Sequence, residues 1–417
     1  MQLSIAATWS ISILSIVLML VRPRRLPEYV WICGGAALLL VARLISPAAA
    51  LDAVLKGTDV YLFLFGMMLL AELARHEGVF DWIADLAMHH ARHSRLRLFL
   101  LIYLTGTVVT ALLSNDATAV VLTPAVLAAV RRARVEPKPY LFACAFIANA
   151  ASFVLPISNP ANLVIYGRHL PMLSEWVRMF ALPSVISIVA TYFILQWMSW
   201  QELRGTYEPS KEEIRLTGRG KLALAGLASS AAVLLSASAL GRGLGAPTCV
   251  AGLLSVGLVS AKDRSVPLKV GKDVAWGVLA LVAGLFVMVE ALSHAGLINA
   301  ADAAMTWLLR QSGLVALLGS ALGVAAISNV MNNLPVALAS GSALEHLSHA
   351  ARLGHALLLG VDLGPNLSVT GSLATILWLI ALRREDVHIT PWEFLRYGLV
   401  MMPVALLLSV LAVSIAK

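Results

Sequence analysis

The sequence has little charge for its length. Only 13% of its 417 residues are Asp, Glu, Lys or Arg, whereas a typical soluble domain has roughly 25%. The deficit is spread along the chain as apolar runs, and the longest polar stretch is residues 201–219. No soluble domain can therefore be separated from the rest. A chain that is 59% hydrophobic in this way is typical of a membrane-embedded protein.

Cysteines and nucleotide-binding motifs are also scarce. Cys33, Cys144 and Cys249 lie isolated in largely apolar runs, without the spacing of metal ligands or of a disulfide framework. The chain has no phosphate-binding loop. We therefore expect no cofactor and no nucleotide hydrolysis by this chain. A transporter is a better reading than an enzyme.

The positive charge is distributed unevenly. No basic residue precedes the first apolar stretch, and Arg22, Arg24 and Arg25 follow it. A cleavable signal peptide has the opposite order, so we expect a retained first helix with its N-terminus outside. In that orientation the expected cytoplasmic segments hold 23 of the 31 Lys and Arg residues. The net charge of +8 thus fits the positive-inside rule and gives no reason to expect a nucleic-acid partner.

Most apolar runs are long enough to cross a hydrocarbon core of about 30 Å. Two runs, 98–130 and 313–341, instead have an arm of about 15 residues, a polar tip and a second short arm. Such an arm reaches only about 22 Å, which predicts two re-entrant hairpins. The expected full spans lie near 3–21, 27–46, 57–73, 174–198, 221–240, 245–261, 274–292 and 392–414, and two more, 139–168 and 353–382, are broken in the middle.

The chain also repeats itself. The pattern Glu72, His76, Gly78 recurs at positions 290, 294 and 296, and the Ser114-Asn115 pair recurs at 328–329. Because the order of spans, hairpin and broken helix is the same in each half, we predict two repeats of inverted topology. Transporters of that architecture bind their solute near the midplane. The predicted fold is an all-α integral membrane protein of about ten transmembrane helices plus two hairpins, with repeats at 1–198 and 221–417 and a cytoplasmic linker at 199–220.

Polar residues gather at the hairpin tips and at the helix breaks. Irregular backbone at membrane depth persists only where protein or a water-filled cavity satisfies it, and Asn, Ser and Thr can both donate and accept hydrogen bonds. This lining suits a solute rich in hydroxyl groups, although single residues could simply cap half-helices. The candidate substrate-binding residues are Ser114, Asn115, Asp116, Thr118, Ser158, Asn159, Asn162, Ser328, Asn329, Asn332, Asn333, Gly364, Asn366, Thr370 and Ser372.

Two acids lie within these segments, Asp116 and Asp362, and no Lys or Arg does. An ionisable group at membrane depth is by default a functional-site hypothesis, so both are candidate proton carriers. A helix cap is the competing reading for each of them. An acidic tip would repel a carboxylate solute, which disfavours an anion as substrate.

Several motifs resemble the bacterial arsenite efflux pump of the ArsB family, within the ion-transporter superfamily. They are Ser114-Asn115-Asp116-Ala117 with Leu122-Thr123-Pro124, Asn332-Asn333-Leu334-Pro335, and Asp362-Leu363-Gly364-Pro365-Asn366 with Gly371-Ser372-Leu373-Ala374-Thr375-Ile376-Leu377-Trp378-Leu379. The resemblance covers essentially the whole chain. It implies proton-coupled export of arsenite and antimonite as neutral trihydroxy species from the bacterial inner membrane. Arsenite or antimonite would then be the only metal species bound, and some family members associate with a cytoplasmic ATPase.

Two departures from the family pattern are visible. Ser368-Val369-Thr370 stands where the family usually has a Thr-Pro pair, so the second kink lacks its second proline. The tips read Ser-Asn-Asp and Ser-Asn-Val instead of the Ser-Asn-Thr of sodium-linked relatives, which argues against sodium coupling. The alternatives are an anion or dicarboxylate transporter on the same scaffold, a channel, and an intramembrane enzyme using Ser114.

Overall fold

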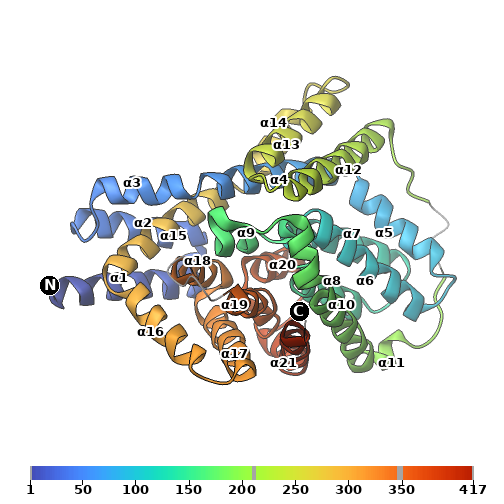
Figure 1. Cartoon of the computed structure of the whole chain (residues 1–417). Helices are drawn as coiled ribbons and strands as arrows, with labels where there is room; N and C mark the ends of the chain where they lie inside the picture. Colours follow the sequence, from blue (N-terminus) through green and yellow to red (C-terminus); the bar gives the residue numbers. More distant parts are fainter. Residues whose placement is uncertain (1, 209–212, 345–350, 416–417) are drawn as a thin grey trace.

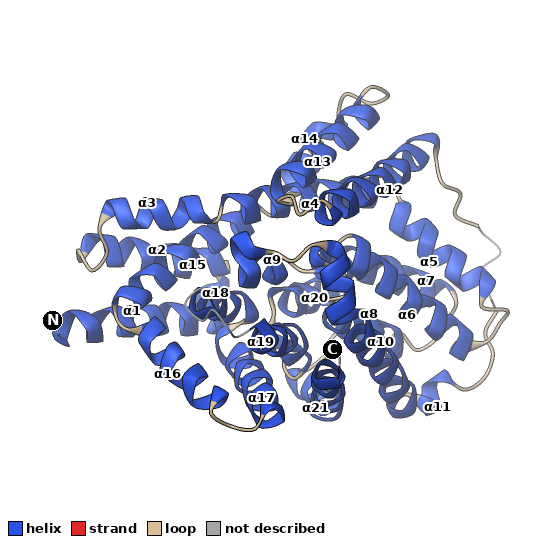
Figure 2. Ribbon diagram, viewed as in Figure 1, coloured by secondary structure: helices blue, strands red, loops and turns tan. Residues whose placement is uncertain are grey.

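The computed structural model describes residues 2–208, 213–344 and 351–415, and this part is built from helices without a strand (Figure 2). The all-α class is confirmed. In Figure 1, α1 to α3, α15 and α16 lie on one side and α5 to α7 on the other, with α9 and α18 to α20 between them.

The first half of the chain runs from α1 to α10. A linker with the short helix α11 (Trp200–Leu203) follows. The elements are α1 (Gln2–Val21), α2 (Glu28–Val41), α3 (Pro47–Lys56), α4 (Thr58–His76), α5 (Val79–His90), α6 (Arg95–Leu112), the π-helical turn η2 (Ala117–Leu122), α7 (Thr123–Arg132), α8 (Lys138–Ala150), α9 (Pro160–Tyr166) and α10 (Leu173–Met198).

The second half repeats this order element by element. The elements are α12 (Gly218–Ala239), α13 (Gly245–Ser260), α14 (Val266–Asp273), α15 (Trp276–His294), α16 (Leu297–Leu309), α17 (Gly313–Met331), α18 (Asn333–Leu344), α19 (Ala351–Leu363), α20 (Leu373–Arg384) and α21 (Pro391–Ile415). Equivalent helices have similar lengths: α4 and α15 each have 19 residues, and α8 and α19 each have 13.

The two halves also pack into each other in an equivalent way. Helix α4 packs against α13, and its counterpart α15 packs against α2. The repeated Glu-His-Gly motif marks the end of α4 and of α15. Gly78 and Gly296 follow these helices with φ of 70° and 96°, a left-handed conformation that glycine adopts without steric cost. The motif thus turns the chain into α5 and α16.

Seven helices are long and apolar enough to cross a membrane, and an eighth counts if α3 and α4, bent by 49°, form one span. This finding fits a multi-pass membrane protein. Two of the expected full spans are shorter than predicted, because α2 has 14 residues and α13 has 16. Both expected broken helices are present as half-helices, α8 with α9 and α19 with α20.

Both predicted hairpins contain a reversal of the chain, but their first arms are longer than expected. Helices α6 and α17 have 18 and 19 residues, or about 27–28 Å at 1.5 Å per residue, so arm length alone does not exclude a crossing. The reversal is visible in contacts. After α6 ends, the Thr118 hydroxyl returns to lie 2.8 Å from the Thr110 hydroxyl, and α18 packs back on α17.

The turn of the second hairpin lies at the end of the predicted polar tip, residues 328–333. Ser328 and Asn329 are still inside α17, and the chain turns at Asn332, which has a φ of 74°. The spacing that relates the two Glu-His-Gly motifs also pairs Ser114-Asn115 with positions 332–333. The dipeptide match at 328–329 was therefore out of register by about one helical turn.

Candidate substrate site

Both chain reversals and both helix breaks meet at one small cavity. Five of the predicted site residues line it, together with Leu64, Val278 and four other apolar residues. Its volume is about 10 Å³, which is room for about one water molecule. The polar side chains of the lining are Asn115, Asp116, Asn159, Asn333 and Ser372.

Asp116 is the acid of this cavity. The predicted alternative, a cap on the second arm, does not describe it, because its carboxylate makes no cap hydrogen bond. The preceding side chains hold the turn instead: the backbone N–H of Ala117 donates to the Ser114 hydroxyl (3.1 Å), and that of Asp116 donates to the Asn115 side chain (2.9 Å). The Asp116 carboxyl group is thereby left on the cavity wall.

A wide vestibule leads from one face of the protein to Asp116. It has a volume of about 570 Å³, and it shares Leu64, Asp116, Pro160 and Val278 with the central cavity. Val120 of the first hairpin lies on its wall. The site is therefore continuous with this side of the protein.

A second vestibule of about 700 Å³ is built from equivalent positions of the other half. Leu338 and Glu290 line it, and they are the repeat counterparts of Val120 and Glu72 in the first vestibule. In the part of the chain that the structure describes, its lining has no residue in common with the central cavity. Val60 lines the second vestibule, whereas Leu64, one helical turn further, lines the cavity, so about one layer of side chains separates them.

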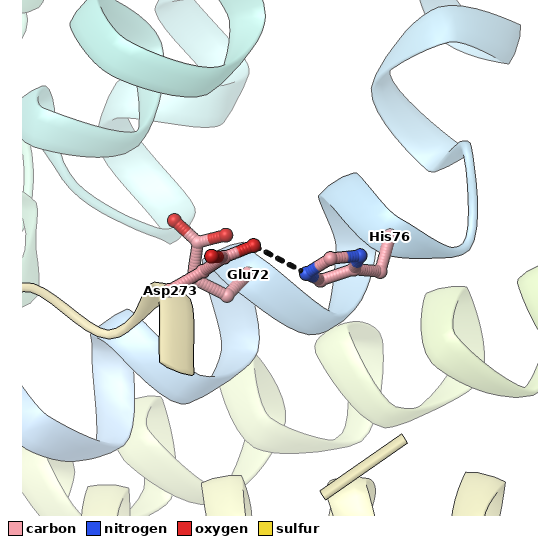
Figure 3. Close-up of side chains that lie close together, drawn as sticks. All are labelled: Glu72, His76 and Asp273. Atoms are coloured by element: carbon pink, nitrogen blue, oxygen red, sulfur yellow. Dashed lines mark hydrogen bonds and ion pairs between the residues drawn. The ribbon is translucent and has the colours of Figure 1, made fainter. Parts of the chain in front are cut away.

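The mouth of the first vestibule carries a charged cluster (Figure 3). One guanidinium nitrogen of Arg75 lies 2.6 Å from Glu72 and 2.5 Å from Asp273, and His76 lies 2.8 Å from Asp273. Partial burial alone would raise the pKa of Asp273, but the hydrogen bonds from Arg75 and His76 lower it below its usual value. One histidine and two carboxylates could ligate a divalent cation, yet Arg75 already forms ion pairs with both carboxylates. An ion-pair network explains the cluster without a metal.

The equivalent mouth of the second vestibule has its own network. Glu290 pairs with Lys56 at 3.1 Å and with His294 at 3.4 Å. Each copy of the repeated Glu-His motif thus lies at the mouth of one vestibule.

Several predicted site residues hold the first helix break and do not face the cavity. The Asn162 amide donates to the carbonyls of Ser152, Leu155 and Pro156 at 2.9, 3.3 and 3.4 Å. The Ser158 hydroxyl donates to the carbonyl of Ala111 at 3.0 Å. The Asn162 bonds satisfy carbonyl groups of the interrupted helix, and the Ser158 bond satisfies a carbonyl group at the end of α6, as buried backbone requires.

The second break is tied to the second hairpin in the same manner. The Asn329 amide donates to the carbonyl of Gly364 (2.8 Å), and the hydroxyls of Ser368 and Thr370 donate to the Asn329 side chain and carbonyl (2.6 and 2.9 Å). Ser368 and Thr370 stand where the resemblance to the ArsB family predicts a Thr-Pro pair. Their hydroxyl groups fix the backbone at a position that lacks the second proline.

Four further predicted residues do not line the central cavity. Thr118 pairs with Thr110, Asn332 reaches the carbonyl of Thr370 at 3.5 Å, and the buried Ser328 hydroxyl has no hydrogen-bond partner. Gly364 is needed for close packing, because a Cβ atom there would lie 2.6 Å from the Cα atom of Ala325. None of these four residues lines the central cavity.

Several buried hydrogen bonds cross between the halves, and two of them join amide and carboxyl side chains at the helix breaks. The Asn149 amide donates to Asn366 at 3.0 Å, and the Asn159 amide donates to Asp362 at 2.7 Å. Asn149 was not predicted, since a single Asn in an apolar helix carries no distinctive signal. Its position, equivalent to that of Asp362 in the other half, could have revealed it.

A model of the citrate transporter family matches residues 9–361. The chain belongs to this family. As a citrate transporter family member it is 30% identical over 373 residues to an uncharacterized transporter of Mycobacterium tuberculosis, with 84% of each chain covered. It is 27% identical over 428 residues to the arsenical pump membrane protein of Yersinia enterocolitica, covering 97% of both, and 27% over 371 residues to that of Escherichia coli, covering 84% of both.

The fold of this family member is similar to a solved transporter structure. The YdaH transporter of Alcanivorax borkumensis, described as having an unusual topology, superposes with a TM-score of 0.58 over 88% of this chain and 86% of the other, at 15% identity. The predicted resemblance to ArsB-like ion transporters is confirmed by the arsenical pump relatives. The chain is a multi-pass membrane transporter.

Proposed function

We propose that this transporter exports arsenite and antimonite as neutral trihydroxy species in exchange for protons. The observation that carries the proposal is the composition of the central cavity. Its polar lining consists of three amides, one hydroxyl and the carboxyl group of Asp116, and no Lys or Arg lines it. Such a site offers hydrogen bonds to hydroxyl groups and no compensating charge for an anion. The names of the arsenical pump relatives agree with this solute.

Asp116 is the proton carrier in this proposal. Its ionised carboxylate accepts hydrogen bonds from the solute hydroxyls, with Asn115, Asn159 and Asn333 completing the set. A proton that arrives from outside neutralises the carboxylate and weakens solute binding. Protonation and solute binding thus exclude each other at one group, which couples the two fluxes.

The charge distribution supports an assignment of the two faces. The first vestibule opens among residues 72–75, 273 and 384–385, which belong to or border segments expected in the cytoplasm from their Lys and Arg content. In our proposal the structure is therefore open to the cytoplasm, with the N-terminus outside and the chain in a bacterial inner membrane. The two hairpins are re-entrant loops that enter from opposite faces.

Arsenite uptake into everted membrane vesicles under a proton gradient tests the proposal. The wild-type chain should accumulate arsenite, and Asp116→Asn should lose gradient-driven uptake by about 100-fold, since one positioned acid/base group typically contributes 10²–10⁴. Asp386→Asn is the matched control, because Asp386 is exposed and lies outside the cavity lining, and it should retain wild-type uptake. Full gradient-driven uptake by Asp116→Asn would end the proposal.

The same assay in proteoliposomes without nucleotide examines the energy source. Uptake driven by the proton gradient alone is expected from a secondary transporter. Uptake only after addition of a separate ATPase subunit and ATP would contradict antiport by the chain itself.

Transport of an anion such as a di- or tricarboxylate is the second candidate. Two observations favour it: the matching family is described by citrate, and Arg75 and Arg384 line the first vestibule. These arginines lie at the entrance and not at the cavity, which is why we rank this function lower. Vesicle flux of citrate and succinate measured beside arsenite separates the two, since an anion carrier should concentrate the carboxylates and leave arsenite behind.

A further inference from the structure

Asn149 and Asp362 occupy the same place in the two halves of the protein. Each is the penultimate residue of the first half of a broken helix, because α8 ends at residue 150 and α19 at residue 363. Each side chain accepts a hydrogen bond from the N-cap residue that follows the break of the opposite half, Asp362 from Asn159 at 2.7 Å and Asn149 from Ser372 at 3.5 Å. These two crossing bonds are equivalent, but one position carries an amide and the other a carboxyl group.

The amide of Asn149 uses both of its hydrogen-bonding functions. Its nitrogen donates to Asn366 at 3.0 Å, and its oxygen accepts from the Ser372 hydroxyl at 3.5 Å. A neutral carboxylic acid has the same inventory, one O–H donor and one carbonyl acceptor, whereas an ionised carboxylate only accepts. Asp362 therefore matches its counterpart only when it is protonated.

The surroundings of Asp362 suit the neutral form. The residue is 1% exposed, and one carboxyl oxygen accepts from Asn159. Ser152, whose hydroxyl donates to the Asn149 carbonyl at 2.7 Å, also lies beside the carboxyl group, while no donor among the described residues has hydrogen-bond geometry to the second carboxyl oxygen. The ionisable group that faces Asp362 is the Tyr166 phenol on α9, and the nearest ionisable residue along α19 is His355, two turns earlier. Helices α8, α17, α18 and α21 also pack on α19, and within the described residues they place no cation in an ion pair with Asp362. Buried charges in proteins are paired, or the group is neutral.

The location of Asp362 separates it from the solute path. It lines neither vestibule nor the central cavity, whereas its partner Asn159 lies on the cavity wall beside Asp116. A proton on Asp116 can exchange with the first vestibule. A proton on Asp362 has no such exit in this conformation.

We infer that Asp362 acts as a neutral carboxylic acid that positions Asn159 in the substrate cavity, as Asn149 contacts Ser372 of the other half, and that it does not release the transported proton. The inference rests on the proposed proton antiport with Asp116 as carrier. In this inference Asp362 is a positioning residue. Of the two predicted proton carriers, Asp116 exchanges its proton and Asp362 keeps it.

Transport by Asp362→Asn and Asp362→Ala provides the first test. The amide reproduces the neutral acid, so Asp362→Asn should keep gradient-driven arsenite uptake within about twofold of wild type, with an unchanged pH profile. Asp362→Ala removes the acceptor for Asn159 and should raise KM about tenfold, the equivalent of one lost hydrogen bond. Loss of proton-driven uptake in Asp362→Asn with arsenite binding retained would make Asp362 the carrier. An Asp362→Asn variant as impaired as Asp362→Ala would show that the ionised carboxylate is needed.

A second test needs no transported solute. Aspartate in an unfolded chain is ionised above about pH 4, so a folded protein that keeps Asp362 protonated binds one more proton than the unfolded chain. Stability then falls as pH rises, and the Tm of wild type in detergent should decrease from pH 5 to 8 relative to that of Asp362→Asn. A constant Tm difference across this range, or an Asp362→Asn variant that does not fold, would overturn the inference. Failure of arsenite transport would leave this result intact, so the two failures are distinguishable.

Discussion

Single glycines determine the closest helix contacts between the two halves. A Cβ atom on Gly66 would lie 2.3 Å from the backbone oxygen of Thr248 on α13, and one on Gly284, its repeat counterpart, would lie 2.9 Å from a methyl carbon of Ile32 on α2. Close approach of backbones is how membrane helices associate. The repeat thus extends to equivalent glycines at equivalent helix contacts.

We predict that Gly66→Ala destabilises the protein by about 1–3 kcal/mol, because the helices must separate to admit the methyl group. Gly34→Ala on α2 is the control: no atom lies within 4 Å of the added carbon, so this variant should gain about 0.5–1 kcal/mol from helix propensity. Thermal unfolding in detergent measures both. Equal stability of the two variants would refute the packing argument.

Asn162 gives a second prediction at this scale. Its amide serves three carbonyl groups of the first break, so Asn162→Asp replaces two donor hydrogens by acceptors and should cost about 1–3 kcal/mol. The measurement is the yield and Tm of folded protein. If Asn162 contacted solute instead, the variant would keep its Tm and lose only arsenite binding.

Sequence reasoning could not sort either the acids or the amides by position. Both Asp116 and Asp362 were selected because an acid without a basic neighbour is rare at membrane depth, but only Asp116 lies on the cavity wall. The amides could not be sorted in advance. Asn115, Asn159 and Asn333 face the cavity while Asn162 and Asn329 bind carbonyl groups, and the same side-chain chemistry serves both purposes.

At the scale of elements, the second arm of the first hairpin is held by a buried ion pair. Asp85 on α5 is 3% exposed, accepts from Arg132 of α7 at 3.2 Å, and accepts from the backbone N–H of Ile214 in the linker at 2.9 Å. One carboxyl group therefore joins the hairpin, α5 and the segment that connects the repeats.

We predict that Asp85→Ala destabilises the protein by about 2–3 kcal/mol. Removing one partner of a buried pair costs about 3–5 kcal/mol, and water screens part of this loss because a third of the Arg132 side chain is exposed. Glu385→Ala removes a half-exposed partner of Arg131 and should cost less than about 1 kcal/mol. Urea or thermal unfolding of both variants measures the two losses of stability, and equal losses would contradict the prediction.

Element order could be predicted from the sequence, whereas element ends could not. Hydropathy and breaker residues located both chain reversals and both broken helices, because apolar length and Pro/Gly interruptions act locally. The predicted tip 328–333 includes the turn at Asn332, but its start at Ser328 was too early, since a helix that continues past Ser328 depends on the tertiary contacts of Asn329 with the second break. No local pattern records such a contact.

At the scale of the whole molecule, the two halves have the same order of helices, but equivalent helices lie in different surroundings. Equivalent residues line both vestibules, and only the first vestibule reaches the cavity among the described residues. An alternating transporter with internal repeats is expected to exchange these roles. The described conformation is then one of a pair.

Cysteine labelling at the equivalent positions Val120 and Leu338 tests this relation. In a background without native cysteines, a membrane-impermeant thiol reagent should label Val120→Cys in everted vesicles and Leu338→Cys in intact cells. Lowering the external pH should change the two labelling rates in opposite directions, because opening one vestibule closes the other. Labelling of both positions from one face would contradict the assignment of faces.

The size of the central cavity also affects how a solute can pass through the protein. A space of about 10 Å³ admits roughly one water molecule, so a solute must leave its hydration shell in the vestibule and push the walls apart. Stripping water from an ion costs far more than stripping it from a neutral molecule whose hydroxyl groups find replacement partners. In our proposal a constriction this narrow is thus a filter against hydrated ions, in addition to the hydrogen bonds that its polar side chains offer to the solute.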